Sequence, residues 1–105
     1  MQVTVVVPVY NEERTVVTLL KRVLAAGMNL KEIVVVDDGS KDATREKVAE
    51  LAAVDPRVRL LPQRQNGGKG LALRAGFAAA TGDIVVVQDA DLEYDPAELP
   101  RLLQP

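Results

Sequence analysis

Three short runs of β-branched residues and one alternating segment divide the chain, and longer stretches with apolar residues every three or four positions separate them. Short apolar β-branched runs are typical of strands buried on both faces, and the longer period is typical of helices with one packed face. A segment that alternates polar and apolar residues is expected at a sheet edge. The pattern predicts buried strands at Val3–Val9, Glu32–Val36 and Ile84–Val87, and an edge strand at Arg57–Leu61.

Helices are predicted between these strands, and local residues mark where the first two begin and end. Asn11 is the expected N-cap of the first helix, and Gly27 is its expected end. Ser40 or Asp42 is expected to cap the second helix, which Asp55-Pro56 ends.

A glycine-rich loop, Gln63–Gly70, follows the third strand and leads into a helix at Leu71–Ala80. Leu73 and Phe77 lie four residues apart and are expected on the inner face of that helix. The loop sequence QRQNGGKG lacks the GxxxxGK[ST] spacing of a phosphate-binding loop. Lys69 is therefore interpreted first as part of a turn that starts the helix, and direct phosphate binding is the minority interpretation.

The elements alternate as β-α-β-α-β-α-β, and a last short helix is expected to begin at Asp95-Pro96. Such alternation is typical of a parallel sheet with helices on both faces, and right-handed crossovers leave few topologies. The sequence predicts an α/β fold with three layers, a Rossmann-like parallel sheet of order 3-2-1-4. A chain of 105 residues is expected to form a single domain.

Composition narrows the functional classes. Hydrophobic residues make up 48% of the chain, and with only three aromatics the core must consist of Val, Leu, Ile and Ala. The net charge of −2 and the absence of a basic stripe argue against nucleic acid as a partner. The chain has no Cys, which removes thiolate metal sites and favours the cytoplasm, and it has no His. Its apolar runs are too short to span a bilayer.

Acidic residues follow the last predicted strand in the sequence Asp89-Ala90-Asp91. Alternate residues of an extended segment share a side and lie roughly 6.6 Å apart, so both carboxylates can converge on one ligand. Carboxylate oxygens suit Mg²⁺ or Mn²⁺, which takes its other ligands from water and phosphate. The sequence predicts a metal held by Asp89 and Asp91, although turn capping is the common role of an isolated Asp in this position.

Polar residues also follow the first and second strands, and ligands of such sheets bind beyond the carboxyl ends of adjacent strands. Asp38 or Asp37 is expected to accept hydrogen bonds from a base or ribose, although turn capping is the favoured interpretation of Asp37. Glu12 can reach a ribose hydroxyl, or its negative charge can stabilise the positive end of the helix dipole. Tyr10 can pack on a base or at the rim of the site. Val36 would contribute only its backbone.

Four segments together carry a family resemblance: VVVPVYNEE, VVVDDGSKDAT, NGGKGLALRAGFAAATGD and VVVQDADLEYDP. They resemble family 2 glycosyltransferases of the GT-A fold, most of all the dolichol- or polyprenol-phosphate sugar synthases. The resemblance implies a UDP- or GDP-sugar donor, a divalent metal, and a lipid-phosphate or saccharide acceptor. It implies that five residues contact the nucleoside, namely Pro8, Tyr10, Glu12, Val36 and Asp38. It implies that three residues contact the diphosphate and the metal, namely Asp89, Ala90 and Asp91.

The resemblance also implies that residues 1–105 form the donor-binding N-terminal half of a longer catalytic domain. The expected place of action is the cytoplasm, peripheral to a membrane when the acceptor is a polyprenyl or dolichyl phosphate. No residue can be named as the catalytic base. An unpaired fourth strand would invite association of copies, so a homo-oligomer through that edge is expected.

Two other functional classes compete with a transferase. The first is a non-catalytic nucleotide-binding or assembly module, in which the fold persists without turnover. The second is a receiver-like signalling domain, suggested by VVVDDGS. That fold requires a phosphoacceptor Asp after its third strand, where this chain has Leu61-Pro62, so the receiver interpretation is disfavoured.

Overall fold

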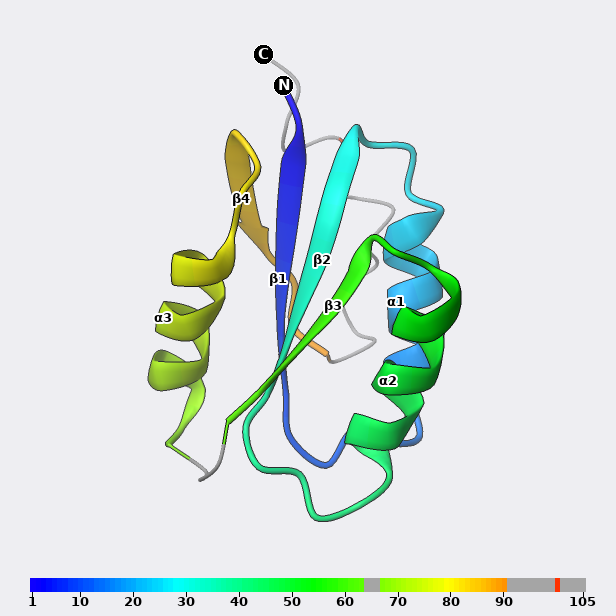
Figure 1. Ribbon diagram of the computed structural model, residues 1–105, viewed down its shortest axis with the longest axis vertical. Coiled ribbons are helices and arrows are strands. Elements are labelled where there is room, and N and C mark those ends of the chain that lie inside the picture. The colour runs from blue at the N-terminus through cyan, green and yellow to red at the C-terminus, as the bar shows by residue number, and fades with distance from the viewer. Residues whose placement is uncertain (64–66, 91–99, 101–105) are drawn as a thin grey trace.

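The structure is a computed structural model that describes residues 1–63, 67–90 and 100 (Figure 1). Four parallel strands form one sheet in the order β3-β2-β1-β4, as the sequence predicts. Their bounds differ from the predicted ones by at most two residues. The strands are β1 (Val3–Val9), β2 (Leu30–Asp37), β3 (Val58–Pro62) and β4 (Ile84–Val87).

Helices cover both faces of this sheet, which confirms the three-layer arrangement. α1 (Val16–Leu24) and α2 (Thr44–Val54) lie on one face, and α3 (Lys69–Ala79) lies on the other. The alternating side chains of β1 supply both cores, because Val5 and Val7 pack toward α1 while Val6 packs toward α3. Full burial of such a side chain contributes about 1.5–3 kcal/mol.

α3 packs on the sheet through small residues, which corrects the predicted inner face. Ala72 and Gly76 are its buried residues, whereas Phe77 is 49% exposed. A Cβ at Gly76 would lie 2.4 Å from Cγ1 of Val6, so only glycine allows the helix backbone this close to β1. Leu73 lies at the margin of the same core.

The predicted N-cap of α1 is wrong. α1 begins at Val16 after Thr15, and Asn11 lies in the preceding loop with a left-handed φ of 52°. The helix starts late because the loop after β1 is bonded to the loop after β2. For α2, Asp42 precedes the N-cap Ala43 and accepts the backbone N–H of Thr44 at 2.9 Å, so Asp42 serves the helix start.

β4 is less buried than the sequence predicts. Val85 and Val87 are each 39% exposed. They pair with Thr4 and Val6, so they share the α3 face of the sheet, but α3 packs over β1 and β2 and leaves them uncovered. The expected last helix, from Asp95-Pro96, lies outside the described residues.

At the amino-terminal end of the sheet, the hydrogen-bonded carboxylate of Glu32 holds the strands together. Oε2 of Glu32 accepts bonds from the Thr4 hydroxyl at 2.7 Å and from the backbone N–H of Thr81 at 2.7 Å, and Oε1 pairs with Arg59 at 2.6 Å. Burial alone would raise the pKa of Glu32, but these bonds outweigh it and lower the pKa from 4.5 to about 2. This cluster joins β1, β2, β3 and the start of β4.

Candidate functional site

A cavity of about 350 Å³ opens at the carboxyl ends of β1, β2 and β4. This is the edge of a parallel sheet at which ligands bind. The cavity brings together most of the predicted site residues. The described residues that line it are Pro8, Val9, Tyr10, Glu12, Asp38, Lys69, Ala72, Asp89 and Ala90.

Val36 does not belong to this lining, because it is fully buried in the core beneath α3, with Val6 and Val34. Asp91, the other predicted metal ligand, lies outside the described residues.

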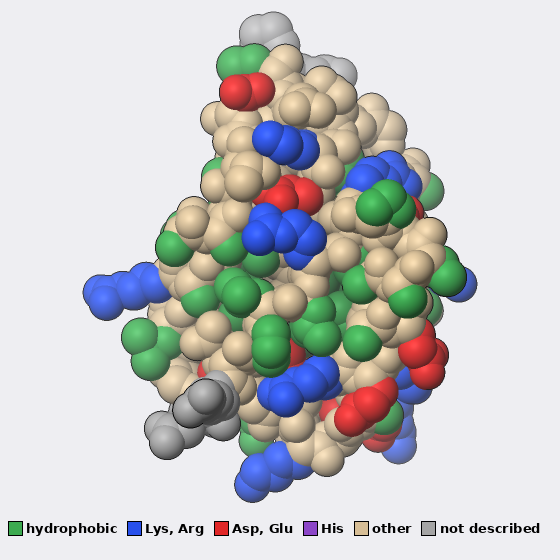
Figure 2. All heavy atoms as spheres, viewed as in Figure 1, with side chains coloured by type: hydrophobic (Ala, Val, Ile, Leu, Met, Phe, Trp, Pro, Cys, Tyr) green, Lys and Arg blue, Asp and Glu red, His purple; other side chains and the backbone are tan. Residues whose placement is uncertain are grey.

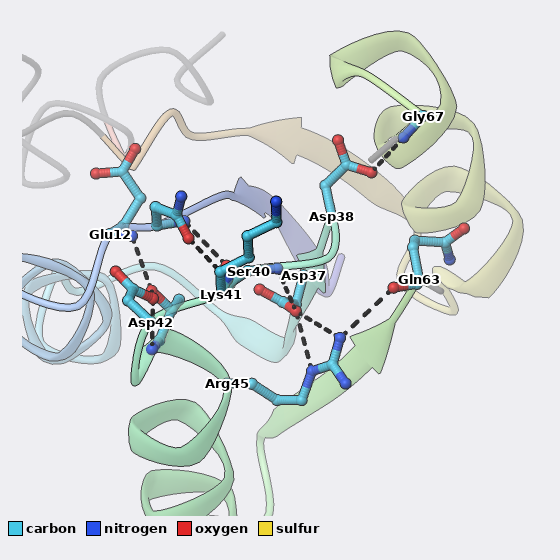
Figure 3. A network of polar contacts seen from close by, with 11 residues as sticks. Glu12, Asp37, Asp38, Ser40, Lys41, Asp42, Arg45, Gln63 and Gly67 are labelled. Carbon is cyan, nitrogen blue, oxygen red and sulfur yellow. Dashed lines mark hydrogen bonds and ion pairs between the residues drawn. The ribbon is translucent and has the colours of Figure 1, made fainter. Parts of the chain in front are cut away.

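The loops after β1 and β2 are bonded into a single platform through Asn11 and its neighbour. The backbone N–H of Asn11 donates to Oγ of Ser40 at 2.9 Å, and Oδ1 of Asn11 accepts the N–H of Lys41 at 2.8 Å. The N–H of Glu12 donates to the hydroxyl oxygen of Thr44 at 2.8 Å (Figure 3). These bonds fix the backbone on both sides of Tyr10 and Glu12. Sequence reasoning missed this role of Asn11, although Asn is among the few residues that tolerate a left-handed φ.

A second set of bonds strengthens the platform on the helix side. The backbone N–H of Ala43 donates to Oε2 of Glu13 at 3.2 Å, and Nζ of Lys47 donates to the carbonyl of Glu13 at 2.9 Å. Burial raises the pKa of Asp42, but hydrogen bonds from Thr44 and Glu13 outweigh it, so the pKa is lowered. Asp42 therefore stays ionised and keeps both loops joined.

Asp37 is structural, in agreement with its interpretation as a turn-capping acid. Its side chain is fully buried, and Oδ2 accepts Nε of Arg45 at 3.0 Å and the N–H of Ser40 at 3.3 Å. Figure 3 shows Arg45 reaching from α2 between Asp37 and the carbonyl of Gln63. Within the described residues, Oδ1 of Asp37 has no hydrogen-bond partner. The carboxylate thus ties β2 to α2 and the end of β3.

Asp38, the next residue, points the other way and holds the glycine-rich loop. Its two oxygens accept the backbone N–H groups of Gly67 and Gly68, each at 3.0 Å. Figure 3 shows the bond to Gly67. Asp38 is 5% exposed, and it lines the cavity. Each carboxylate oxygen can accept two hydrogen bonds, so Asp38 retains capacity for a ligand donor.

Lys69 and Asp89 form an ion pair at the cavity that joins the first residue of α3 to the segment after β4. Both side chains are partly exposed, Lys69 at 59% and Asp89 at 40%. Sequence reasoning gave Lys69 only a minority role because the loop lacks a phosphate-loop spacing. Only the fold shows that α3 begins opposite the end of β4.

The donor set at Asp89 fits a hard cation. The carboxylate is exposed to the cavity and already attracts a cationic group, the ammonium of Lys69. Magnesium is commonly bound through one or two carboxylates, with other ligands from water and phosphate. Within residues 1–63, 67–90 and 100, no three acidic side chains gather into a complete metal site. Among the described residues of the cavity, Asp89 is thus an exposed carboxylate that could hold Mg²⁺ or Mn²⁺.

The outer surface carries both signs of charge. On the face seen in Figure 2, Lys and Arg side chains are interspersed with Asp and Glu side chains instead of gathering in one basic area.

Comparison with known proteins defines the class of protein to which this fold and cavity belong. The family model described as "Glycosyl transferase family 2" matches residues 4–105. The chain belongs to glycosyl transferase family 2. This agrees with the resemblance in its four sequence segments.

Among curated relatives is an undecaprenyl-phosphate 4-deoxy-4-formamido-L-arabinose transferase from Pectobacterium carotovorum subsp. carotovorum (strain PC1). It is 44% identical over 107 residues, which cover 97% of this chain and 32% of that protein. The chain thus spans about a third of the length of the curated relatives it matches.

Two solved structures have the same fold. A mannosyltransferase from Pyrobaculum calidifontis, in complex with GDP-Man and Mn²⁺, superposes with a TM-score of 0.78 at 37% identity. The match covers 85% of this chain and 27% of that one. A glucosyl-3-phosphoglycerate synthase from Mycobacterium tuberculosis, in complex with Mn²⁺ and UDP, has a TM-score of 0.76 at 32% identity, covering 97% and 38% respectively. The fold is thus that of GT-A glycosyltransferases.

Proposed function

We propose that residues 1–105 form a donor-binding domain that holds a nucleotide-diphosphate sugar through Mg²⁺ or Mn²⁺. The observation that carries this proposal is the convergence of Asp38 and Asp89 on one cavity at the carboxyl end of the sheet. Asp38 supplies buried acceptor oxygens, and Asp89 supplies an exposed carboxylate. The cavity thus offers hydrogen-bond acceptors to the N–H and O–H groups of a nucleoside, and a carboxylate to a cation that binds phosphate.

The lining residues divide between these two roles. Pro8, Tyr10, Glu12 and Asp38 would contact the nucleoside, with a backbone contribution from Val36. The half-exposed ring of Tyr10 offers a packing surface, and the bonded platform keeps Glu12 beside it. Ala90 would lie against the diphosphate, while Asp89 and Asp91 would hold the metal. The cation, when bound, neutralises diphosphate charge, and this favours departure of the nucleotide from the sugar.

The acceptor would be a lipid phosphate or a saccharide. The name of the relative from Pectobacterium includes undecaprenyl phosphate, which supports a polyprenyl phosphate. Within the described part of the chain, no helix combines the length and the apolar character that a bilayer crossing requires. A polyprenyl phosphate acceptor would place the domain in the cytoplasm, peripheral to the membrane that carries this acceptor.

Calorimetric titration tests donor binding and names the base. UDP and GDP would be titrated with and without Mn²⁺ into the chain, into a D89A/D91A variant, and into a D83A control at the opposite end of the sheet. We expect one nucleotide to bind in a metal-dependent manner, with binding lost in D89A/D91A and kept in D83A. Absence of binding to well-folded protein, or equal binding by D89A/D91A, would overturn the proposal.

A non-catalytic nucleotide-binding or assembly module is the second candidate. It requires only the nucleotide contacts proposed above, from the cavity residues Asp38 and Asp89. Such a module would bind nucleotide in the same cavity without turnover. Release of sugar from the donor, with water or a polyprenyl phosphate as acceptor, separates the two functions.

Association of copies through β4 stays a prediction. It is supported by the partial exposure of Val85 and Val87 on β4. Light scattering at high protein concentration measures it directly, and a monomer there would contradict it.

A further inference from the structure

We propose that Lys69 is a displaceable counter-ion for Asp89: it neutralises this carboxylate when no divalent cation is present, and the cation must displace it in order to bind. The inference rests on the proposed donor-binding function and deepens it. It assigns the glycine-rich loop a regulatory contact with the metal anchor. The first observation is the ion pair between Nζ of Lys69 and Oδ1 of Asp89.

The loop that carries Lys69 is held independently of this pair. Gly67 and Gly68 donate their backbone N–H groups to Asp38, and Gly68 has a left-handed φ of 88° that turns the chain into α3. Lys69 is the first residue of α3. Because the backbone is fixed at Asp38, only the flexible Lys69 side chain has to move when the ammonium leaves Asp89.

The contact has the properties of a pair that can be exchanged. Both partners are substantially exposed, at 59% and 40%, so water screens their attraction. Exposed pairs of this kind shift an equilibrium by about 1.4- to 5-fold. A divalent cation carries twice the charge and adds water or phosphate ligands of its own. The cation therefore displaces the ammonium from the carboxylate. Competition with the ammonium lowers the affinity of Asp89 for the cation.

The same contact connects the two ends of the cavity. Asp38 at the nucleoside end holds the loop, and the loop places Lys69 on Asp89 at the metal end. α3 packs mainly over β1 and β2, so this ion pair is a bridge between that helix and the segment after β4. Cation binding is thus expected to break this bridge between α3 and the end of β4.

The test is the affinity for Mn²⁺ alone, measured by the loss of the free-ion paramagnetic resonance signal in the absence of nucleotide. K69M removes the ammonium but keeps the length of the side chain. K31M is the matched control, because Lys31 donates to the carbonyl of Thr81 at the opposite end of the sheet and carries the same charge. We expect K69M to bind Mn²⁺ about two- to fivefold more tightly than wild type, and K31M to match wild type within about 1.5-fold.

A second pair of variants tests whether the gain in Mn²⁺ affinity depends on Asp89. In a D89N background, K69M is expected to produce no increase in Mn²⁺ affinity, because the shared carboxylate is gone. Equal affinities of K69M and K31M, weaker binding by K69M, or a gain that survives D89N would each overturn the inference. Binding by K69M with none by wild type supports it.

Failure of the proposed function looks different. If neither wild type nor K69M binds Mn²⁺ with or without UDP or GDP, the donor site itself is wrong, and the inference falls with it. If both bind Mn²⁺ equally and only with nucleotide, the donor site stands and the counter-ion role is wrong.

Discussion

The two ends of the sheet use carboxylates in opposite ways. At the amino end, Glu32 is almost fully buried and all its described bonds come from the chain itself. At the carboxyl end, Asp89 is 40% exposed to a cavity, and the ammonium of Lys69 pairs with it. The difference indicates how one chemical group, the carboxylate, serves stability where the chain itself uses its acceptor oxygens, and is suited to binding where these oxygens face a cavity.

The largest effect on stability is expected from E32Q. The lowering of the Glu32 pKa from 4.5 to about 2 corresponds to about 3 kcal/mol of stability at neutral pH. The amide lacks this charge and places a donor where the carboxylate accepts bonds from Thr4 and Thr81. Denaturant unfolding at pH 7 is expected to show a loss of about 3 kcal/mol. Unchanged stability would contradict the account of the amino end.

The pH dependence of unfolding sharpens the same comparison. A carboxyl whose pKa is lower in the folded state stabilises fully above its unfolded value, and the contribution disappears as the pH falls through the folded value. Glu32 should therefore make wild-type stability fall between pH 4.5 and pH 2. E32Q should lose less stability over that window. Parallel wild-type and E32Q curves would exclude Glu32 as the source.

A smaller effect is expected at the carboxyl-end platform from N11A. Alanine loses the bond to Lys41 and tolerates a left-handed φ less well, so N11A should cost about 1–2 kcal/mol. N11G keeps the backbone conformation and should cost less than about 1 kcal/mol. Denaturant unfolding and nucleotide titration measure both variants. We expect N11A to weaken nucleotide binding more than N11G, and the reverse order would contradict the role of the turn.

The smallest effect on stability is expected from V85T/V87T. Both valines are partly exposed, so the change should stay within about 0.5 kcal/mol for each residue. If copies associate through this face, sedimentation should show less association of the variant than of wild type. Association that is unaffected by the variant would move the contact elsewhere.

The strands and their order were predictable because β-branched runs and the alternation with helices are local signals. The site was predictable to the extent that strand ends meet at one edge, which brought Asp38 and Asp89 together. Periodicity reports which residues share a face, but not whether another element covers that face. This is why the exposure of Phe77, Val85 and Val87 was not foreseen.

Contacts between distant loops were beyond the sequence for another reason. Asn11 bonds to residues about 30 positions away, and Asp38 bonds to glycines at a similar separation. These bonds depend on the distance between two loops, which the packed sheet sets. The ion pair of Lys69 with Asp89 likewise depends on where α3 begins relative to β4.

The most direct test of the account is nucleotide titration in the presence of Mn²⁺ for wild type, D38N and E32Q, each under conditions where it is folded. D38N is expected to bind at least about tenfold more weakly, because its amide cannot accept both glycine N–H groups and a nucleoside donor. E32Q is expected to keep the wild-type affinity despite its lower stability. Wild-type affinity in D38N, or an equal loss in E32Q, would contradict a donor site at the carboxyl end of the sheet.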